Sequence, residues 1–326
     1  MPTDTAIKTA PRSVKQIHEM PLDDKLWLAN ERIKDWHEFH EGKVYVAFSG
    51  GKDSELLLYL VRLLYKDVPA VHAATGLEYP QITKHVLEHE NVVVVRPKKT
   101  YRDVIEEYGF PVVSKRVSRY VSDLRRPKDV NAATQNLRLT GMTKEGKFAK
   151  SMMLPKKWRF LVDAPFKISN QCCEVIKKEP LKRYQRETGR FPYVGTTASE
   201  SMDRLKVWLK VGRNQFNAKS PISAPLSMFT EQDVLVCVRR FGLKLAPVYG
   251  EIVENADGTL RTTGEQRTGC MFCLFGAHLD TPPNRFQRMK TTHPQLHAFC
   301  MDKLGLRSIC KFVGIEVEPD NGPFKA

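Results

Sequence analysis

The chain has 326 residues, of which 41% are hydrophobic and 27% are charged, a balance typical of globular proteins with a substantial core. No apolar run approaches the roughly 20 residues that a membrane helix needs, and the start of the chain lacks the apolar core of a signal peptide. The composition therefore argues against a membrane protein, and we expect a cytoplasmic protein with no membrane partner. The 52 Lys and Arg exceed the 37 Asp and Glu, and the formal charge of +15 favours a polyanionic partner such as nucleic acid.

The first part of the chain alternates between apolar runs and helical patterns. Residues 1–22 are polar and without pattern, which predicts a flexible N-terminal arm. A helix is expected over residues 23–40, where four apolar residues from Leu26 to Trp36 recur at spacings of three and four. The alternation that follows predicts strands at 44–48, 68–73 and 92–95 and helices at 54–65 and 81–89. Such βαβ units predict an α/β fold with a parallel sheet sandwiched by helices, and ligands bound beyond the carboxyl ends of the strands.

The patterns in the rest of the chain are weaker. Two helical segments between residues 100 and 126 meet at Gly109-Phe110-Pro111, and the polar, basic residues 127–157 predict a long loop or insertion. The remaining expected elements are a strand at 193–196, helices at 199–210, 231–241 and 293–314, and a hairpin turn at Asp257-Gly258. We therefore predict one α/β domain over residues 23–245, with the basic insertion near 127–157, and a helical, cysteine-containing segment over 246–326 that packs on the same domain.

Basic residues are concentrated in two stretches. The first comprises Lys115, Arg116, Arg119, Arg125, Arg126 and Lys128, and the second comprises Lys144, Lys147, Lys150, Lys156, Lys157 and Arg159. A single nucleotide site would use about five or six basic residues, so the excess extends beyond one cleft. Because a solvated basic face without a partner is about as common, the charge alone leaves both interpretations open.

A glycine-containing loop, Ser49-Gly50-Gly51-Lys52-Asp53-Ser54, joins the predicted strand at 44–48 to the predicted helix at 54–65. Adjacent glycines allow the backbone to approach an anion, and the N–H groups of the first helical turn point toward it. The loop matches neither the P-loop nor the dinucleotide-binding fingerprint. It resembles the PP-loop of the ATP pyrophosphatase superfamily, whose members split ATP between the α- and β-phosphates, and so predicts that the domain over 23–245 binds ATP.

Four of the seven cysteines form two pairs, Cys172-Cys173 and Cys270-Met271-Phe272-Cys273. Four thiolates suit either a structural zinc ion or an iron-sulfur cluster. Directly adjacent cysteines are awkward for zinc, whose ligand pairs are usually two to four residues apart, so the spacing favours the cluster. Four cysteines that only pack in a core are the structural alternative. Of the others, Cys237 lies in an apolar helical stretch and is expected in the core, whereas Cys300 and Cys310 could be either packed or reactive.

Six blocks between about residues 43 and 314 resemble the phosphoadenosine phosphosulfate reductase family, a branch of the PP-loop superfamily. They are Ser49 to Ser54; Thr75-Gly76-Leu77-Glu78-Tyr79-Pro80; Cys172-Cys173 with Lys177-Lys178-Glu179-Pro180-Leu181; Gly195-Thr196-Thr197-Ala198-Ser199-Glu200-Ser201; Pro225-Leu226 with Phe229-Thr230-Glu231-Gln232-Asp233-Val234; and Thr268 to Cys273. The resemblance implies an adenine-nucleotide α-hydrolase-like, Rossmann-like fold. It also implies a [4Fe-4S] cluster on Cys172, Cys173, Cys270 and Cys273, as in the adenylyl-sulfate reductases.

Two departures from the family pattern bear on the activity. The assimilatory reductases carry a redox cysteine in a C-terminal Glu-Cys-Gly-Leu-His segment, whereas the tail here reads Arg307-Ser308-Ile309-Cys310-Lys311-Phe312. Those reductases also have degenerate phosphate loops, whereas this loop is intact, which suggests that ATP is consumed. The combination is closer to the sulfur-transfer proteins of DNA phosphorothioation and similar in logic to the iron-sulfur-dependent tRNA thiolases. Ala74 stands where an acidic residue often precedes Thr-Gly, so no metal role is carried over to it.

The resemblance assigns roles to the loops. Ser49, Gly50, Gly51 and Ser54 would hold the β- and γ-phosphates, and Lys52 would neutralise charge on the leaving pyrophosphate. Asp53 would place Mg²⁺, or else only complement the helix dipole. Thr75, Gly76, Glu78 and Gly195 would line the nucleotide or substrate site, and Arg204 is expected either to contact phosphate or to lie on a solvated helix face.

Three functions remain open from the sequence. The first is an ATP-dependent sulfur-transfer or adenylylating enzyme that acts on nucleic acid with a sulfur donor or a sulfur-transfer partner protein. The second is a reductase of adenylyl sulfate or phosphoadenylyl sulfate, with Cys300 or Cys310 as nucleophile. The third is a non-catalytic binding module stabilised by zinc. The intact loop favours the first.

Overall fold

The computed structural model describes residues 19–197 and 214–318. The chain divides into two compact units whose segments alternate along the sequence. Of the described residues, the first unit comprises 19–74, Glu78–Arg96, 180–197 and 214–268, and the second comprises Thr75–Leu77, Pro97–Glu179 and 269–318. This division differs from the predicted boundary at 245/246 because the chain leaves the first unit after strand β3 and returns to it only at Pro180. The predicted N-terminal arm lies almost entirely outside the described residues, and so does the helix predicted at 199–210.

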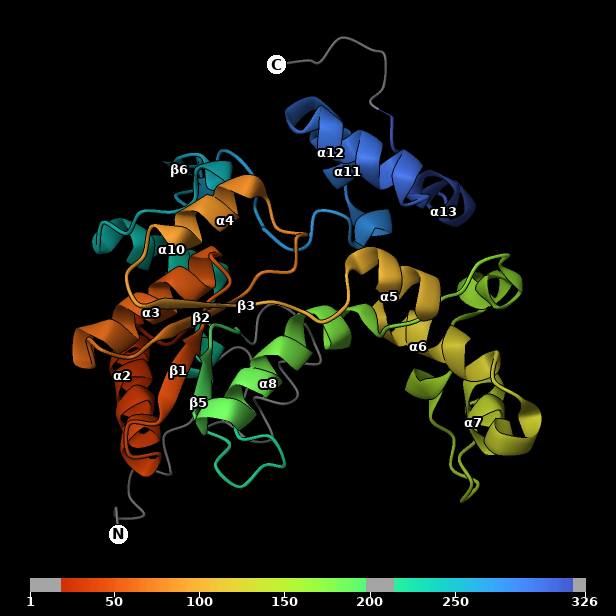
Figure 1. Cartoon of the computed structure of the whole chain (residues 1–326), viewed down its shortest axis with the longest axis horizontal. Coiled ribbons are helices and arrows are strands. Elements are labelled where there is room, and N and C mark those ends of the chain that lie inside the picture. The colour runs from red at the N-terminus through yellow and green to blue at the C-terminus, as the bar shows by residue number, and fades with distance from the viewer. Residues whose placement is uncertain (1–18, 198–213, 319–326) are drawn as a thin grey trace. The chain divides into compact units, whose positions relative to one another are not determined.

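A four-stranded parallel sheet forms the centre of the first unit (Figure 1). Its strands, in spatial order, are β3 (Val92–Val95), β2 (Ala70–Ala73), β1 (Val44–Ala47) and β5 (Phe191–Val194). In the central strand, Val46 pairs with Ala70 on one side and Tyr193 on the other. Helix α3 (Lys52–Leu64) connects β1 to β2, and α4 (Pro80–Leu87) lies between β2 and β3 along the chain. The predicted βαβ alternation is confirmed, with β5 two residues earlier than expected.

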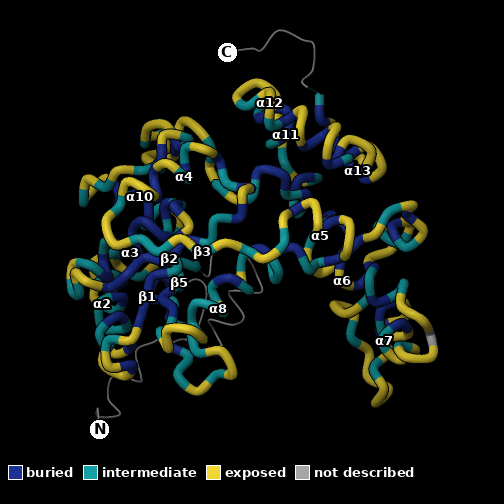
Figure 2. The backbone as a smooth tube through the Cα atoms, in the orientation of Figure 1, coloured by how far each residue is buried: buried dark blue, intermediate teal, exposed yellow. Residues whose placement is uncertain are grey.

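Helices cover both faces of this sheet. The Tyr193 hydroxyl donates a hydrogen bond to the Ile33 carbonyl of α2 (Leu22–Phe39), whereas the Tyr45 ring packs edge-on against Tyr184 of α8 (Glu179–Thr188). Because residues 45 and 46 point to opposite faces of β1 and Val46 pairs with Tyr193, α2 and α8 lie on opposite sides. The central strands are accordingly among the most buried segments (Figure 2). The predicted sandwich of helices around a parallel sheet is confirmed.

The rest of the first unit consists of short elements after β5. They are η6 (Pro225–Met228), α10 (Glu231–Arg240), η7 (Pro247–Tyr249), β6 (Ile252–Glu254) and β7 (Leu260–Thr262). Thr230 and Asp233 form a capping box that starts α10, and the antiparallel β6–β7 pair confirms the predicted hairpin. Cys237 is fully buried in α10, as expected.

The second unit is mainly helical. Its first segment holds α5 (Tyr101–Glu107), β4 (Val112–Val113), α6 (Lys115–Leu124), α7 (Lys128–Thr140) and three short helices, η2 (Lys150–Met152), η3 (Lys156–Asp163) and η4 (Glu174–Lys178). The C-terminal segment holds β8 (Leu274–Phe275), η8 (Ala277–Leu279), α11 (Arg285–Thr292), α12 (Pro294–Ala298), η9 (Phe299–Lys303) and α13 (Leu306–Val313). β4 and β8 pair in parallel and join the two segments. The prediction of a helical, cysteine-containing C-terminal part is confirmed, and no helix within 19–197 and 214–318 has the length and apolar character to cross a membrane.

The prediction that residues 127–157 form a loop was wrong in part. Helix α7 occupies 13 of these residues and ends at Gly141, whose φ is +79°. Its buried contacts are polar: the Arg138 guanidinium pairs with Asp123 at 3.0 Å, and the Gln135 amide donates to the Leu124 carbonyl. Because the helix packs through charged and amide side chains, its sequence lacks the apolar stripe that predicts a helix.

Candidate nucleotide and cysteine sites

The Ser49–Ser54 loop begins two residues after β1 and runs directly into α3. Hydroxyl groups within the loop accept hydrogen bonds from its backbone amides. The Ser49 N–H donates to Ser54 Oγ at 3.3 Å, and the Gly51 N–H donates to Ser49 Oγ at 3.4 Å. The Ser54 hydroxyl donates in turn to the Gly51 carbonyl at 2.8 Å. Since N–H groups at the start of a helix bind anions readily, these are positions that phosphate oxygens could take over from the hydroxyls.

Two glycines, Gly50 within the loop and Gly195 beside it, lie where a larger residue would collide with neighbouring atoms. Gly50 has a φ of +73°, and a Cβ atom there would lie 2.7 Å from Val86 Cγ2 and 2.9 Å from Ile82 Cγ2 of α4. A Cβ atom at Gly195, just after β5, would lie 3.0 Å from the Asp53 carbonyl oxygen and from the Ser54 nitrogen. The structure thus brings the predicted residue Gly195 against the loop, as expected when neighbouring parallel strands end at one edge of a sheet.

The Gly50→Ala variant is expected to lose nucleotide binding and to melt at a lower temperature. Gly189→Ala is the matched control, because Gly189 also has a positive φ (+66°) but a Cβ atom there would have no neighbour within 4 Å. Alanine costs about 1–2 kcal/mol in the left-handed region at both sites, and only at Gly50 does it also collide with α4. Thermal unfolding and ATP binding to the two variants measure the difference, and equal losses would contradict the packing argument.

Lys52 is buried, and its ammonium group already has partners inside the protein. Its Nζ atom forms an ion pair with Glu231 and donates to the Gln266 carbonyl at 2.7 Å. Glu231 remains 44% exposed, so the pair lies at the surface of the site. A phosphate would therefore have to compete with Glu231 for the Lys52 charge or share it.

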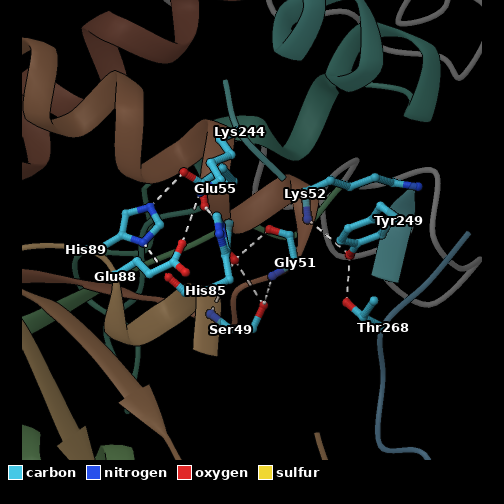
Figure 3. A network of polar contacts seen from close by, with 11 residues as sticks. Ser49, Gly51, Lys52, Glu55, His85, Glu88, His89, Lys244, Tyr249 and Thr268 are labelled. Carbon is cyan, nitrogen blue, oxygen red and sulfur yellow. Dashed lines mark hydrogen bonds and ion pairs between the residues drawn. The ribbon is translucent and has the colours of Figure 1, made fainter. Parts of the chain in front are cut away.

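Tyr249 is a site residue that the sequence did not reveal. Its hydroxyl accepts a hydrogen bond from the Lys52 backbone N–H at 3.2 Å and lies 2.6 Å from Thr268 Oγ1 (Figure 3). Burial raises the pKa of Tyr249 to about 12, so the group is a neutral hydroxyl at physiological pH. The aromatic ring between Pro247 and Gly250 was the only local signal.

The structure places the other predicted nucleotide-site residues in both units. Asp53 is half-buried in the first turn of α3, and Glu78 is half-buried in the first unit. Thr75 and Gly76 fall in the second unit, so their place beside the loop stays a prediction. Thr75 is buried and its hydroxyl accepts from the Leu77 N–H at 3.2 Å, while Gly76 is exposed with a φ of +75°. Arg204 lies outside the described residues.

The four paired cysteines come together in the second unit. Cys172 and Cys173 precede the π-helix η4, and π-helical turns are frequent at functional sites. Cys270 and Cys273 bracket a turn in which the Cys273 N–H donates to the Cys270 carbonyl at 3.1 Å. Burial raises the pKa of the Cys172 thiol, and the negative charges of Cys270, Cys173 and Cys273 raise it further. The two pairs, distant in sequence, are therefore close enough to interact electrostatically.

Polar groups surround these thiols. The Tyr101 hydroxyl is buried without a hydrogen-bond partner, and burial together with the charges of Cys172, Cys300, Cys273 and Cys270 raises its pKa. Arg285 donates to the Cys273 carbonyl at 3.0 Å. The guanidinium of Arg285 and the ammonium of Lys177 oppose the rise in the pKa of Cys273 that burial causes. A negatively charged group bound by the thiolates would thus have an O–H donor and two cations nearby.

A comparison with models of known protein families gives a match to part of the chain. A model of the phosphoadenosine phosphosulfate reductase domain matches the segment that starts one residue before β1 and includes the phosphate loop. The match covers residues 43–143, which are less than half of the chain. The matched segment contains the loop but none of the four paired cysteines, which follow it in sequence.

One curated protein and two solved structures also show similarity to the chain. An uncharacterized protein of Methanocaldococcus jannaschii is 37% identical over 249 residues, which are 74% of this chain and 38% of that protein. The chain therefore spans less than half the length of this curated relative. The crystal structure of phosphoadenylyl-sulfate reductase from Candida auris, a phosphate complex, has a TM-score of 0.36 and 11% identity, covering 78% of this chain and 92% of that chain. The U34-tRNA thiolase NcsA from Methanococcus maripaludis with its [4Fe-4S] cluster has a TM-score of 0.36 and 14% identity, covering 93% of this chain and 84% of that chain.

Proposed function

We propose that this protein is an ATP-dependent enzyme that adenylylates a nucleic acid and transfers sulfur to it, with a [4Fe-4S] cluster on its four paired cysteines. The observation that carries the proposal is that one chain contains both an intact phosphate loop, with amides held by exchangeable hydroxyl groups, and a group of four converging cysteines. A zinc-stabilised binding module would use the cysteines but would not need the loop, and neither would a reductase of preformed adenylyl sulfate.

The phosphate loop supplies the activation step. An oxygen of the substrate attacks the α-phosphorus of ATP, the bond to the β-phosphate oxygen breaks, and pyrophosphate leaves with the electron pair. Ser49, Gly51 and Ser54 bind the β- and γ-phosphates through amide and hydroxyl groups, and Lys52 stabilises the charge that develops on pyrophosphate. Asp53 supplies a carboxylate for Mg²⁺. A sulfur nucleophile then displaces AMP from the activated position.

The spacing of the cysteines supports a cluster over zinc. A single zinc ion with bonds of about 2.3 Å holds its four sulfurs about 3.8 Å apart. Within 19–197 and 214–318, the side chains grouped closely enough to hold a single metal ion are Glu55, His85 and His89, and no cysteine is among them. A cluster of four irons spreads its cysteine ligands more widely, and when bound it would supply either sulfide or an electrostatic anchor for the substrate.

Surface charge in the second unit supports nucleic acid as the acceptor. Five lysines of the predicted insertion are exposed: Lys144, Lys147, Lys150, Lys156 and Lys157. Phe148 and Phe160 are 64% and 44% exposed in the same part of the sequence, and exposed aromatic rings among cations are typical of surfaces that bind single-stranded nucleic acid. Arg125, by contrast, donates to main-chain carbonyls between Leu161 and Phe166. Its guanidinium group therefore stabilises the fold of this segment.

The remaining cysteines argue against a reductase. Such an enzyme needs an accessible thiolate, whereas Cys300 and Cys310 are both fully buried. Burial raises the pKa of Cys310 to about 12 and also raises that of Cys300. Neither side chain is suited to form a covalent intermediate with a nucleotide.

The test is an assay of pyrophosphate release by anaerobically purified protein. We expect iron and acid-labile sulfide in the protein, and pyrophosphate release from ATP that rises when DNA or tRNA is added. Sulfite formation from adenylyl sulfate with thioredoxin would favour the reductase, and zinc without ATP turnover would favour the binding module.

Replacement of Tyr101 by phenylalanine is expected to leave the metal-free protein as stable or more stable, but to weaken the retention of iron in the iron-loaded protein. In the metal-free form the hydroxyl has no partner, so its removal should leave the free energy of unfolding unchanged or raise it by about 1 kcal/mol. In the iron-loaded form, loss of a donor to cluster sulfur should speed iron loss to a chelator. Tyr108→Phe is the control, because the Tyr108 hydroxyl accepts from Lys99. Parallel changes in both forms would contradict a role at the cysteines.

A further inference from the structure

Three side chains beside the phosphate loop form a second cluster of metal-binding groups. Glu55 lies in the first turn of α3, His85 lies in α4, and His89 follows one turn later. Glu55 Oε2 is 2.9 Å from His85 Nε2, and Glu55 Oε1 is 2.9 Å from His89 Nε2 (Figure 3). The three ligand atoms all lie within 4.8 Å of one another. We propose that Glu55, His85 and His89 bind a divalent transition-metal ion, with zinc as the natural occupant.

The orientation of the His89 ring suits a metal ligand. His89 Nδ1 lies 2.9 Å from the His85 carbonyl oxygen, and because a carbonyl can only accept, Nδ1 is the donor in this contact. Nε2, which lies 2.9 Å from Glu55 Oε1, is then the ring nitrogen that can bind a metal ion. Metal-bound histidines commonly donate their other ring N–H to a backbone carbonyl in this way.

The donor set and its burial fit a transition metal. Two imidazoles and one carboxylate suit zinc, iron or manganese, whereas magnesium and calcium prefer oxygen ligands. The side chains of Glu55 and His85 are 10% and 3% exposed, so the site is shielded, and His89 is 20% exposed, which gives an ion a path from solvent. The fourth coordination position would be left for water.

An ion bound between α3 and α4 would also affect how α4 packs against the phosphate loop. It would link the first turn of α3 to α4, the helix whose Ile82 and Val86 pack against Gly50. The ion would therefore hold α4 against the phosphate loop, independently of the cysteine group and of the reaction proposed above.

The experiment compares zinc binding to the full chain and to single variants after treatment with a chelator. Wild type should bind one more equivalent of zinc than His85→Gln or His89→Gln, whose amides can still donate to Glu55, and zinc should raise the melting temperature of wild type more than that of the variants. His37→Gln is the control, because His37 stacks on Tyr65 and contacts no carboxylate in the cluster. All variants retain the four paired cysteines, so zinc held by thiolates cancels in the difference.

A second measurement, on the wild-type protein alone, tests the proposal even if the variants do not fold. Cobalt added to wild type should give the weak visible bands of nitrogen and oxygen ligands at one equivalent, separate from the intense thiolate bands of the cysteine site. Equal zinc binding in wild type and variants, or cobalt bands from thiolate ligands alone, would show that Glu55, His85 and His89 are only a hydrogen-bonded packing cluster.

Discussion

Replacement of Lys52 by alanine is expected to reduce pyrophosphate release from ATP by about 100-fold or more, the effect of removing one donor to developing charge. The loss should appear mainly in kcat, because Lys52 is already paired with Glu231 in the free protein and its charge is needed most when pyrophosphate leaves. Stability should change little, since Glu231 is 44% exposed and would be hydrated in the variant. Steady-state kinetics and thermal melts measure the two effects.

Two further variants make this test specific. Lys43→Ala removes a lysine whose side chain is 65% exposed and which precedes β1, at the opposite end of the strand from the loop, so its activity should match wild type. Glu231→Gln keeps the shape of the ion pair but removes the competing charge, and ATP should bind as tightly or more tightly. If Glu231→Gln and Lys52→Ala instead lost activity and stability together, Lys52 would be only a structural partner of Glu231.

The phosphate loop could be predicted from sequence because its determinants are local. A buried strand, two glycines and a helix start within a dozen residues define both the backbone conformation and the anion-binding amides. The contacts that complete the site could not be predicted, since Tyr249 and Glu231 reach Lys52 from 197 and 179 residues away. Only the folded sheet brings such separated segments together.

The other features that the sequence did not predict depend on polar contacts between segments far apart in the chain. Arg125 counts as a basic residue in the sequence, yet its guanidinium binds main-chain carbonyls in the structure. His85 and His89 have the spacing of two ligands on one helix face, but nothing local indicates that Glu55 lies opposite them. The cysteine pairs were predictable as a group because thiols at paired spacing have few alternative uses outside disulfides.

Replacement of Cys270 by alanine is expected to remove nearly all iron and sulfide from the protein, from about four irons per chain in wild type. The reason is that a four-iron cluster with three thiolates is open to solvent and oxygen at its fourth iron. The second unit should also unfold more readily, since metal affinity contributes to the folding free energy when the ligands come from separate segments. Iron and sulfide analysis with thermal melts, all under anaerobic conditions, gives both results.

Cys237→Ala is the matched control, because Cys237 is equally a free cysteine but lies in the core of α10 in the first unit. Its iron content should equal that of wild type, with at most a small loss of stability from the smaller side chain. The loss of iron in Cys270→Ala should leave nucleotide binding intact, because the loop and the cysteines belong to different units. If Cys270→Ala loses sulfur transfer but still releases pyrophosphate, activation and sulfur delivery are separable steps; if both steps are lost, the cysteine group is required before ATP is cleaved.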